Sequence, residues 1–369
     1  MNDHTRRFAA ADRRRIRRLR WHRAGVVGAL AVVLLLVGAA PAGAHGLGGL
    51  KPTNYETVVQ SVTPRTAGLE VRALDLGTQI ELTNHGDVEV VVLGYAGEPY
   101  LRVGPRGVFE NTRSPATALN RSSTLTGALP ATADATAAPV WRRISSGRTA
   151  RWHDHRAHFM GTEDPPEVAR RPDDRHVVDN FEIPMRAGQH SVVVRGQILY
   201  VPPPSPWPWL LGAVVLAAVV LAVSRTRFWP TTFAIVLGAL ALTELLHVIG
   251  LWGASTASFG TKALESAYSI AGIVLALVAL GWSARKGAES AVPVVLIAAI
   301  FLFVAGGLAD VATLGHSQIP STYGPGFTRL LVTVTLGLGA GLTIAAAWRL
   351  RPAAPVAPVV PVARPRVTS

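Results

Sequence analysis

The chain has 369 residues, of which 49% are hydrophobic and only 16% are charged. Soluble domains usually carry about 25% charged residues, so this composition excludes a protein that is soluble along its whole length. The net charge of +13 does not indicate a nucleic-acid partner, because the arginines gather around apolar stretches and form no basic face with interleaved aromatic residues. The chain has no cysteine, which excludes disulfides and leaves His, Met, carboxylate or backbone groups as metal ligands.

The chain begins with a pattern typical of a signal peptide that has a long basic start. Residues 1–23 contain nine arginines, and residues 24–40 form an apolar stretch that is short for a membrane span. Ala42 and Ala44 supply the small residues of a cleavage site, and cleavage after Ala44 would make His45 the new N-terminus. The alternative is an uncleaved anchor, which would add a sixth membrane span.

The segment that follows, residues 45–203, has the composition of a soluble domain and a pattern of short strands. Residues 114–148 are rich in Ala, Thr and Ser and predict a long irregular excursion. About seven or eight short strands predict an exported all-β domain, either an immunoglobulin-like sandwich or a barrel. Runs rich in Val, Leu, Ile and Thr between Gly, Pro and Asn-His-Gly-Asp turn signals place strands at residues 56–62, 69–76, 79–83, 88–95, 149–153 and 189–201.

A proline-rich linker then leads into five apolar segments that are long enough to span a membrane. They lie at residues 209–224, 229–250, 267–284, 291–309 and 327–348. With the β-domain outside, basic residues end the first, third and fifth spans on the cytoplasmic side, in agreement with the positive-inside rule. The predicted parts are a cytoplasmic basic segment and signal peptide (1–44), an extracytoplasmic β-domain (45–203), a five-helix transmembrane domain (204–350) and a disordered cytoplasmic tail (351–369).

The residues most suggestive of chemistry lie in a histidine-rich run of the β-domain. His153, His155 and His158 occur there together with Asp154 and Met160. On an extended strand, His153 and His155 would share one face. Imidazoles at this spacing can chelate copper, zinc or nickel, and a methionine thioether suits Cu(I). The alternative is a polar turn whose histidines make ordinary hydrogen bonds.

A mature N-terminal His45 would strengthen the metal interpretation. Its free amine and its ring nitrogen belong to one residue, and a second imidazole would complete three nitrogens that suit the tetragonal preference of Cu(II). The sequence therefore predicts a metal site, with a copper ion as the expected occupant, formed by His45, His153, Asp154, His155, His158 and Met160.

Two resemblances accompany these residues. The segments Gly94–Arg102, Trp152–Gly161 and Val201–Trp209 resemble uncharacterised membrane proteins of high-GC Gram-positive bacteria, a likeness that implies topology and no activity. An N-terminal histidine, an Asp-His pair and a multi-span membrane part are also similar to CopC and CopD copper-handling proteins. That resemblance implies a Cu(II) site at His45, Asp154 and either His153 or His155, although the His-Gly-Leu-Gly-Gly opening differs from theirs.

A second set of ionisable residues lies in the membrane part, toward the predicted outer leaflet. It consists of Glu244, His247, Glu265, Asp310 and His316. Glu244 and His247 share one helix face, because they are three positions apart. Ionisable residues within spans are costly and usually face the bundle interior or a wet cavity. These residues predict a relay for metal or protons, and the alternative is a buried pair that only locks helix packing.

We therefore expect a multi-pass protein of the bacterial cell membrane that binds copper outside the cytoplasm and serves copper homeostasis or transport. Its expected partners are the lipid bilayer and a copper donor or acceptor protein, with no nucleic acid. The alternative is an envelope interaction or assembly module that binds no metal. The sequence contains no Walker motif, nucleophile elbow or Rossmann fingerprint, so we expect no enzymatic activity.

Overall fold

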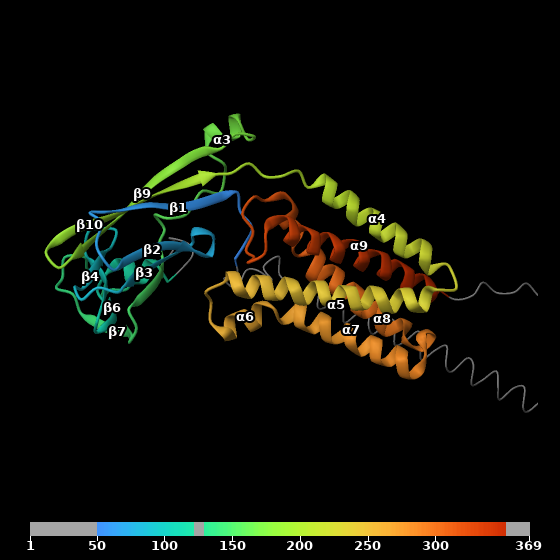
Figure 1. Cartoon of the computed structure of the whole chain (residues 1–369). Coiled ribbons are helices and arrows are strands. Elements are labelled where there is room, and N and C mark those ends of the chain that lie inside the picture. The colour runs from blue at the N-terminus through green and yellow to red at the C-terminus, as the bar shows by residue number, and fades with distance from the viewer. Residues whose placement is uncertain (1–49, 122–128, 352–369) are drawn as a thin grey trace, which may run out of the picture.

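The computed structural model describes residues 50–121 and 129–351. His45, the predicted signal sequence and the predicted C-terminal tail lie outside these residues. The described chain forms a β-domain followed by a bundle of long helices, which occupy opposite ends of the molecule in Figure 1. The predicted order of a β-domain and a helical membrane bundle is therefore confirmed.

The β-domain consists of two antiparallel sheets that share one core. The larger sheet has the order β1-β10-β9-β4-β5-β6-β7 and the smaller one the order β2-β3-β8. Ile80 and Trp152 of the smaller sheet pack in the same cluster as Val92 and Ile183 of the larger one, so the arrangement is a sandwich. The strands are β1 (Tyr55–Thr63), β2 (Leu69–Leu74), β3 (Gln79–Asn84), β4 (Val90–Leu93), β5 (Pro99–Gly104), β6 (Gly107–Asn111), β7 (Trp141–Ser145), β8 (Thr149–His153), β9 (His176–Ala187) and β10 (His190–Tyr200).

Four of these strands, β5, β6, β7 and β9, are additional to the predicted set. β5 starts at a proline and β9 contains Pro184, a residue that normally argues against a central strand. β4 ends its pairing beside Met185, so Pro184 has a neighbouring strand on the β10 side only. The stretch predicted to be irregular contains the short helix α2 (Pro115–Leu119) as well as the edge strand β7.

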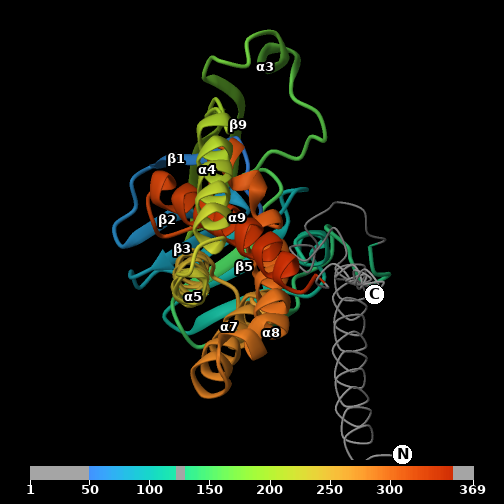
Figure 2. The same cartoon turned by 90° about the vertical axis from the view of Figure 1, so that its right-hand side faces the viewer.

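Within the described residues, five helical segments are long and apolar enough to cross a bilayer, the fourth of which runs through α8 and on to Gly315. Helix α9 contacts α4, α5 and α8, as the end-on view in Figure 2 illustrates. Gly337 and Gly341 face α4, and a Cβ at either position would meet the α4 backbone. The helices are α4 (Trp207–Ser224), α5 (Trp229–Ala254), α7 (Ala267–Lys286), α8 (Ala288–Phe301) and α9 (Pro325–Arg349), with short α6 (Phe259–Glu265) between α5 and α7.

The fourth span is not one regular helix, although the sequence predicts a single span at 291–309. α8 passes into a π-helical segment, η2 (Leu302–Leu308), and then into the 3₁₀ turn η3 (Val311–Gly315). Gly306 lies in the π-helical segment, and a Cβ there would collide with the carboxylate of Glu244. The missing side chain therefore makes room for a buried acid.

The β-domain rests on the end of the bundle through contacts distant in sequence. Thr53 forms a two-way backbone bridge with Gln318, with N···O distances of 3.0 and 2.8 Å. On the other side, the Asp75 carboxylate accepts hydrogen bonds from the N–H of Thr256 at 3.1 Å and from its hydroxyl at 2.5 Å. These contacts join the sandwich to the loops before α9 and after α5.

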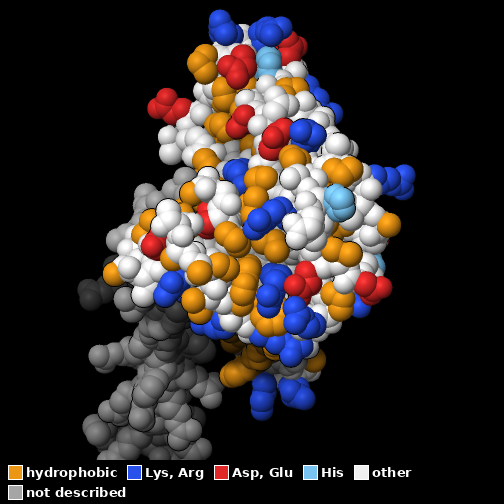
Figure 3. All heavy atoms as spheres, turned by 90° about the vertical axis from the view of Figure 1, so that its left-hand side faces the viewer, with side chains coloured by type: hydrophobic (Ala, Val, Ile, Leu, Met, Phe, Trp, Pro, Cys, Tyr) orange, Lys and Arg blue, Asp and Glu red, His pale blue; other side chains and the backbone are white. Residues whose placement is uncertain are grey.

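The basic residues of the β-domain are largely matched by acidic ones. Glu81 accepts hydrogen bonds from Arg72 at 2.6 Å and Arg151 at 2.5 Å, while Glu110 pairs with Arg142. On the face away from the bundle, arginine, acidic and hydrophobic side chains are interspersed (Figure 3). The charge of this domain is thus distributed in pairs.

Candidate metal centre

The histidine-rich run lies at the end of the sandwich that faces the bundle. His153 is the last residue of β8 and pairs with Gln79, the first residue of β3. The side chain of Gln79 accepts a hydrogen bond of 3.3 Å from the hydroxyl of Thr256, in the loop that follows α5. After His153 the chain leaves the sheet in a turn, which allows the next two histidines to fold back toward the first.

The turn brings the rings of His153, His155 and His158 together. The ring centroid of His153 lies 4.5 Å from that of His155 and 4.6 Å from that of His158. The centroids of His155 and His158 are 5.7 Å apart. One nitrogen of each ring lies within 4.8 Å of the others. Among the residues that the structure describes, this is the one group of three or more His or carboxylate ligands that converges so closely.

Each ring contacts a backbone group through one of its nitrogens. His155 Nε2 lies 3.2 Å from the carbonyl oxygen of Leu119, and His158 Nδ1 lies 3.1 Å from that of Asp154. His153 interacts with the backbone of Thr78, and its buried Nε2 has no hydrogen-bond partner. Histidines that bind metals usually donate their second N–H to such carbonyls, which fixes the ring and exposes the opposite lone pair.

The surroundings favour neutral imidazoles, the form that binds metals. Burial, followed by the proximity of His158 and His155, lowers the pKa of His153 to about 4. Burial is also the main cause that lowers the pKa of His158. A buried, unpaired nitrogen such as His153 Nε2 is costly in a stable fold, and a bound ion would satisfy it.

Met160 extends the cluster with a sulfur atom. Its Sδ lies 3.4 Å from Nδ1 of His155, the nitrogen that the contact with Leu119 leaves free. The Met160 side chain is 39% exposed, so it can move without disturbing the core. Four of the predicted ligands, His153, His155, His158 and Met160, are thus neighbours in space.

Asp154 occupies a different place from the one expected of a ligand. It is fully buried, and its carboxylate binds Arg156 at 2.8 and 2.9 Å and the indole N–H of Trp152 at 2.8 Å. It also accepts the backbone N–H of Arg156. This carboxylate is thus saturated by hydrogen bonds that hold the turn, and it lies outside the group of converging nitrogens.

The predicted membrane set is only partly assembled. His247 Nε2 and Asp310 Oδ2 lie 3.3 Å apart, and both line a small cavity together with Glu265. Glu244 is buried below them, one helical turn along α5. His316 is not part of this lining, and its Nδ1 lies 2.7 Å from the carbonyl of Ala312.

Several groups that support the cluster give no signal in the sequence. Leu119 and Thr78 act through their backbones, so their side-chain types are uninformative. The hydroxyl of Tyr95 accepts a hydrogen bond from the backbone N–H of His155 at 3.1 Å, and its ring packs on Arg156. Burial is the main cause that raises the pKa of Tyr95 to about 12. Only the fold brings the β4–β5 turn, α2 and the β2–β3 connection, which contain these residues, beside the histidines.

The fold and the site define a class: a multi-pass membrane protein whose β-sandwich carries a three-histidine cluster on its bundle-facing end. No family model matches this chain, and no match to it was found among the curated proteins or the solved structures.

Proposed function

We propose that this protein is a membrane-anchored metal-binding protein that handles copper outside the cytoplasm. The observation that carries the proposal is the convergence of three imidazoles. One nitrogen of each ring lies within 4.8 Å of the others, and each ring also contacts a backbone group through one of its nitrogens. Neutral imidazoles suit copper, zinc and nickel. The ion would be held by His153, His155 and His158.

The choice of copper rests on Met160. A thioether is a soft ligand that favours Cu(I) over the harder Zn(II). Its Sδ lies beside the free nitrogen of His155, so one ion can contact both residues after a small movement of the methionine. Three imidazoles and one thioether would give Cu(I) a four-ligand site.

The extracytoplasmic location rests on the charges at the bundle ends. The end remote from the β-domain carries the basic residues that follow α4, α7 and α9, namely Arg225, Arg227, Arg285, Lys286, Arg349 and Arg351. Arginine and lysine next to membrane spans favour the cytoplasmic side, and this preference supports an extracytoplasmic β-domain. A copper donor or acceptor would then meet the cluster at the outer membrane surface.

The test is metal content of the purified full chain in detergent, loaded separately with Cu(I), Cu(II) and Zn(II) and freed of excess metal. We expect the wild-type protein to retain copper and the double variant His153→Ala, His155→Ala to lose it. His190→Ala is the matched control, because His190 is exposed at the start of β10. Equal copper stoichiometry in all three proteins would overturn the site assignment, and stronger retention of zinc than of Cu(I) would overturn the choice of ion.

A further inference from the structure

The membrane bundle holds a second group of ionisable residues, separate from the histidine cluster of the β-domain. Glu244 lies inside the second span and is only 1% exposed. Its Oε1 is buried and has no hydrogen-bond partner, while the hydroxyl of Ser269 on α7 hydrogen-bonds to the same carboxyl group. The carboxyl presses against Gly306 of the π-helical segment η2.

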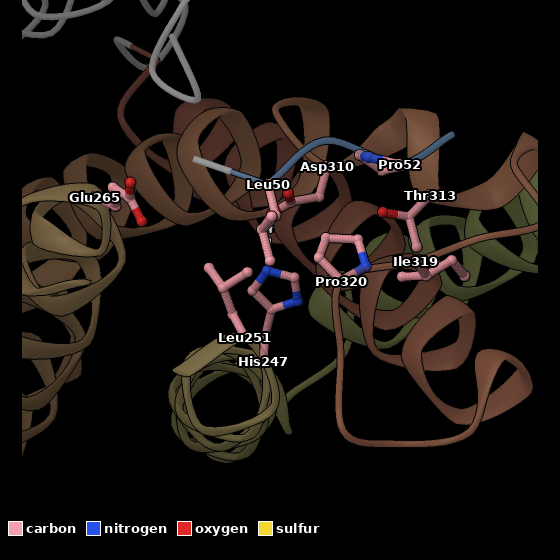
Figure 4. Close-up of a pocket in the computed structure, with 9 residues that line it drawn as sticks. All are labelled: Leu50, Pro52, His247, Leu251, Glu265, Asp310, Thr313, Ile319 and Pro320. Carbon is pink, nitrogen blue, oxygen red and sulfur yellow. Dashed lines mark ion pairs between the residues drawn. The ribbon is translucent and has the colours of Figure 1, made fainter. Parts of the chain in front are cut away.

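A small cavity lies at the end of the bundle near the β-domain, lined by His247, which is one helical turn along α5 from this acid. Figure 4 shows the ring of His247 between Leu50 and Leu251, directed toward Asp310. The cavity measures about 20 Å³, which is room for about one water molecule. Its lining combines an imidazole, the carboxylates of Asp310 and Glu265, and apolar residues from the N-terminal segment and the loop before α9.

The group contains more acidic than basic side chains. If His247 is protonated and Asp310 ionised, the two charges neutralise each other across 3.3 Å. An ionised Glu244 would then add a negative charge in the hydrocarbon region, where ions are costly. Two basic side chains at this end of the bundle are hydrogen-bonded elsewhere: Lys262 of α6 donates to the carbonyl of Trp252 at 2.7 Å, and Arg329 of α9 donates to that of His316 at 2.8 Å.

We propose that Glu244, His247 and Asp310 form a proton-binding site inside the bundle, with Glu244 as the group that takes up the proton from the β-domain side through this cavity. Protonated Glu244 would be neutral and could donate a hydrogen bond, which removes both the buried charge and the unpaired oxygen. Asp310 and Glu265 face the cavity, and α7 contributes Ser269.

A proton fits this group better than a metal ion does. Metal ligands must converge on one point, and the described residues contain such convergence only at the three histidines of the β-domain. Protons move between groups that are connected by hydrogen bonds or by a single water molecule. The one-water cavity supplies such a connection for His247 and Asp310, and His247 lies one helical turn along α5 from Glu244.

The experiment is infrared difference spectroscopy on the full chain in lipid nanodiscs over a range of pH. The readout is the C=O stretch of a protonated carboxylic acid and its shift in deuterated water. We expect this band in the wild-type protein and in Glu289→Gln, and its loss in Glu244→Gln. Glu289 is the matched control, because it undergoes the same change of chemistry at the remote end of the bundle, where its side chain is 80% exposed.

Persistence of the same band in Glu244→Gln would overturn the proposal. A second test needs no substitution: glutamate carboxyls of the wild-type protein are labelled with carbon-13. A glutamic acid band then moves to lower frequency, so a band whose frequency does not change is not from a glutamate and would also overturn the proposal. His247→Gln keeps Glu244 and is expected to slow the exchange of its proton with deuterated water. Copper retention by Glu244→Gln should equal that of the wild type, so this test and the copper test fail independently.

Discussion

The carboxylate of Asp75 in the β-domain accepts two hydrogen bonds from Thr256 in the membrane part, at 3.1 and 2.5 Å. Asp75 lies in a left-handed conformation, with φ of 51°, between β2 and β3. Thr256 also donates to Gln79, whose strand partner is His153 of the histidine cluster. One threonine after α5 therefore connects the helix of Glu244 and His247 to the strands that hold the candidate metal centre.

Replacing this threonine should loosen the junction. In Thr256→Val the hydroxyl that donates to Asp75 is lost, and a hydrogen bond to a charged group contributes about 1.5–3 kcal/mol. We expect faster amide hydrogen exchange at the Asp75 turn and in the loop after α5, with the core strands unchanged. Thr232→Val is the control, because that hydroxyl only caps its own helix at Phe228. Equal exchange rates in both variants would contradict the inference that Thr256 holds the β-domain to the bundle.

Met160 should set the preference for copper over zinc. Met160→Leu keeps the volume but removes the sulfur that lies 3.4 Å from His155. We expect Cu(I) affinity to fall by about tenfold, which equals about 1.4 kcal/mol, while zinc affinity stays the same. Competition titrations with a chromogenic chelator measure both values. A parallel fall for both metals would show that Met160 acts through the shape of the turn and not through its sulfur.

The side chain of Asp154 should stabilise the folded β-domain. Its carboxylate is fully buried and paired with Arg156, and removing one partner of a buried pair costs about 3–5 kcal/mol. We expect Asp154→Ala to lower the melting temperature of the metal-free protein strongly, whereas Glu163→Ala, at an exposed position in the following loop, leaves it unchanged. Loss of copper with an unchanged melting temperature would instead make Asp154 a ligand.

Acid should destabilise the metal-free β-domain through His153. Its pKa is about 4 in the folded protein and about 6.5 in the unfolded chain, so the unfolded state binds more protons between these values. The contribution of His153 to the free energy of unfolding is therefore fully present above about pH 6.5 and is lost as the pH falls toward about 4. Chemical denaturation of the wild type and of His153→Gln should show a steeper loss in the wild type. Identical slopes would contradict the depressed pKa of His153.

The membrane part was the most predictable region, because bilayer thickness dictates long apolar runs that the sequence displays directly. Each helix begins or ends within a few residues of its predicted limit, except in the fourth span. There the apolar run continues while the backbone widens at Gly306 to admit Glu244 of another helix. The apolar pattern of a sequence does not indicate a contact of this kind between two helices.

The β-domain was less predictable, because pairing decides which short segments become strands. β7 reads Trp-Arg-Arg-Ile-Ser, with little apolar alternation, and it is a strand because it adds to the edge of β6. The spacing suggested that His153 and His155 share one face of a strand, whereas β8 ends at His153 and a turn brings the three rings together. The role of Asp154 was hidden, since nothing in the sequence indicates that Arg156 and Trp152 would surround its carboxylate.

The seating of the sandwich has a geometric consequence. The β-domain meets the bundle at the Thr53–Gln318 bridge, at the Asp75–Thr256 contact and through the chain that enters α4 after Tyr200. Three separate supports restrain rocking of the β-domain as well as its rotation. The distance between the histidine cluster and the end of the bundle would then stay constant.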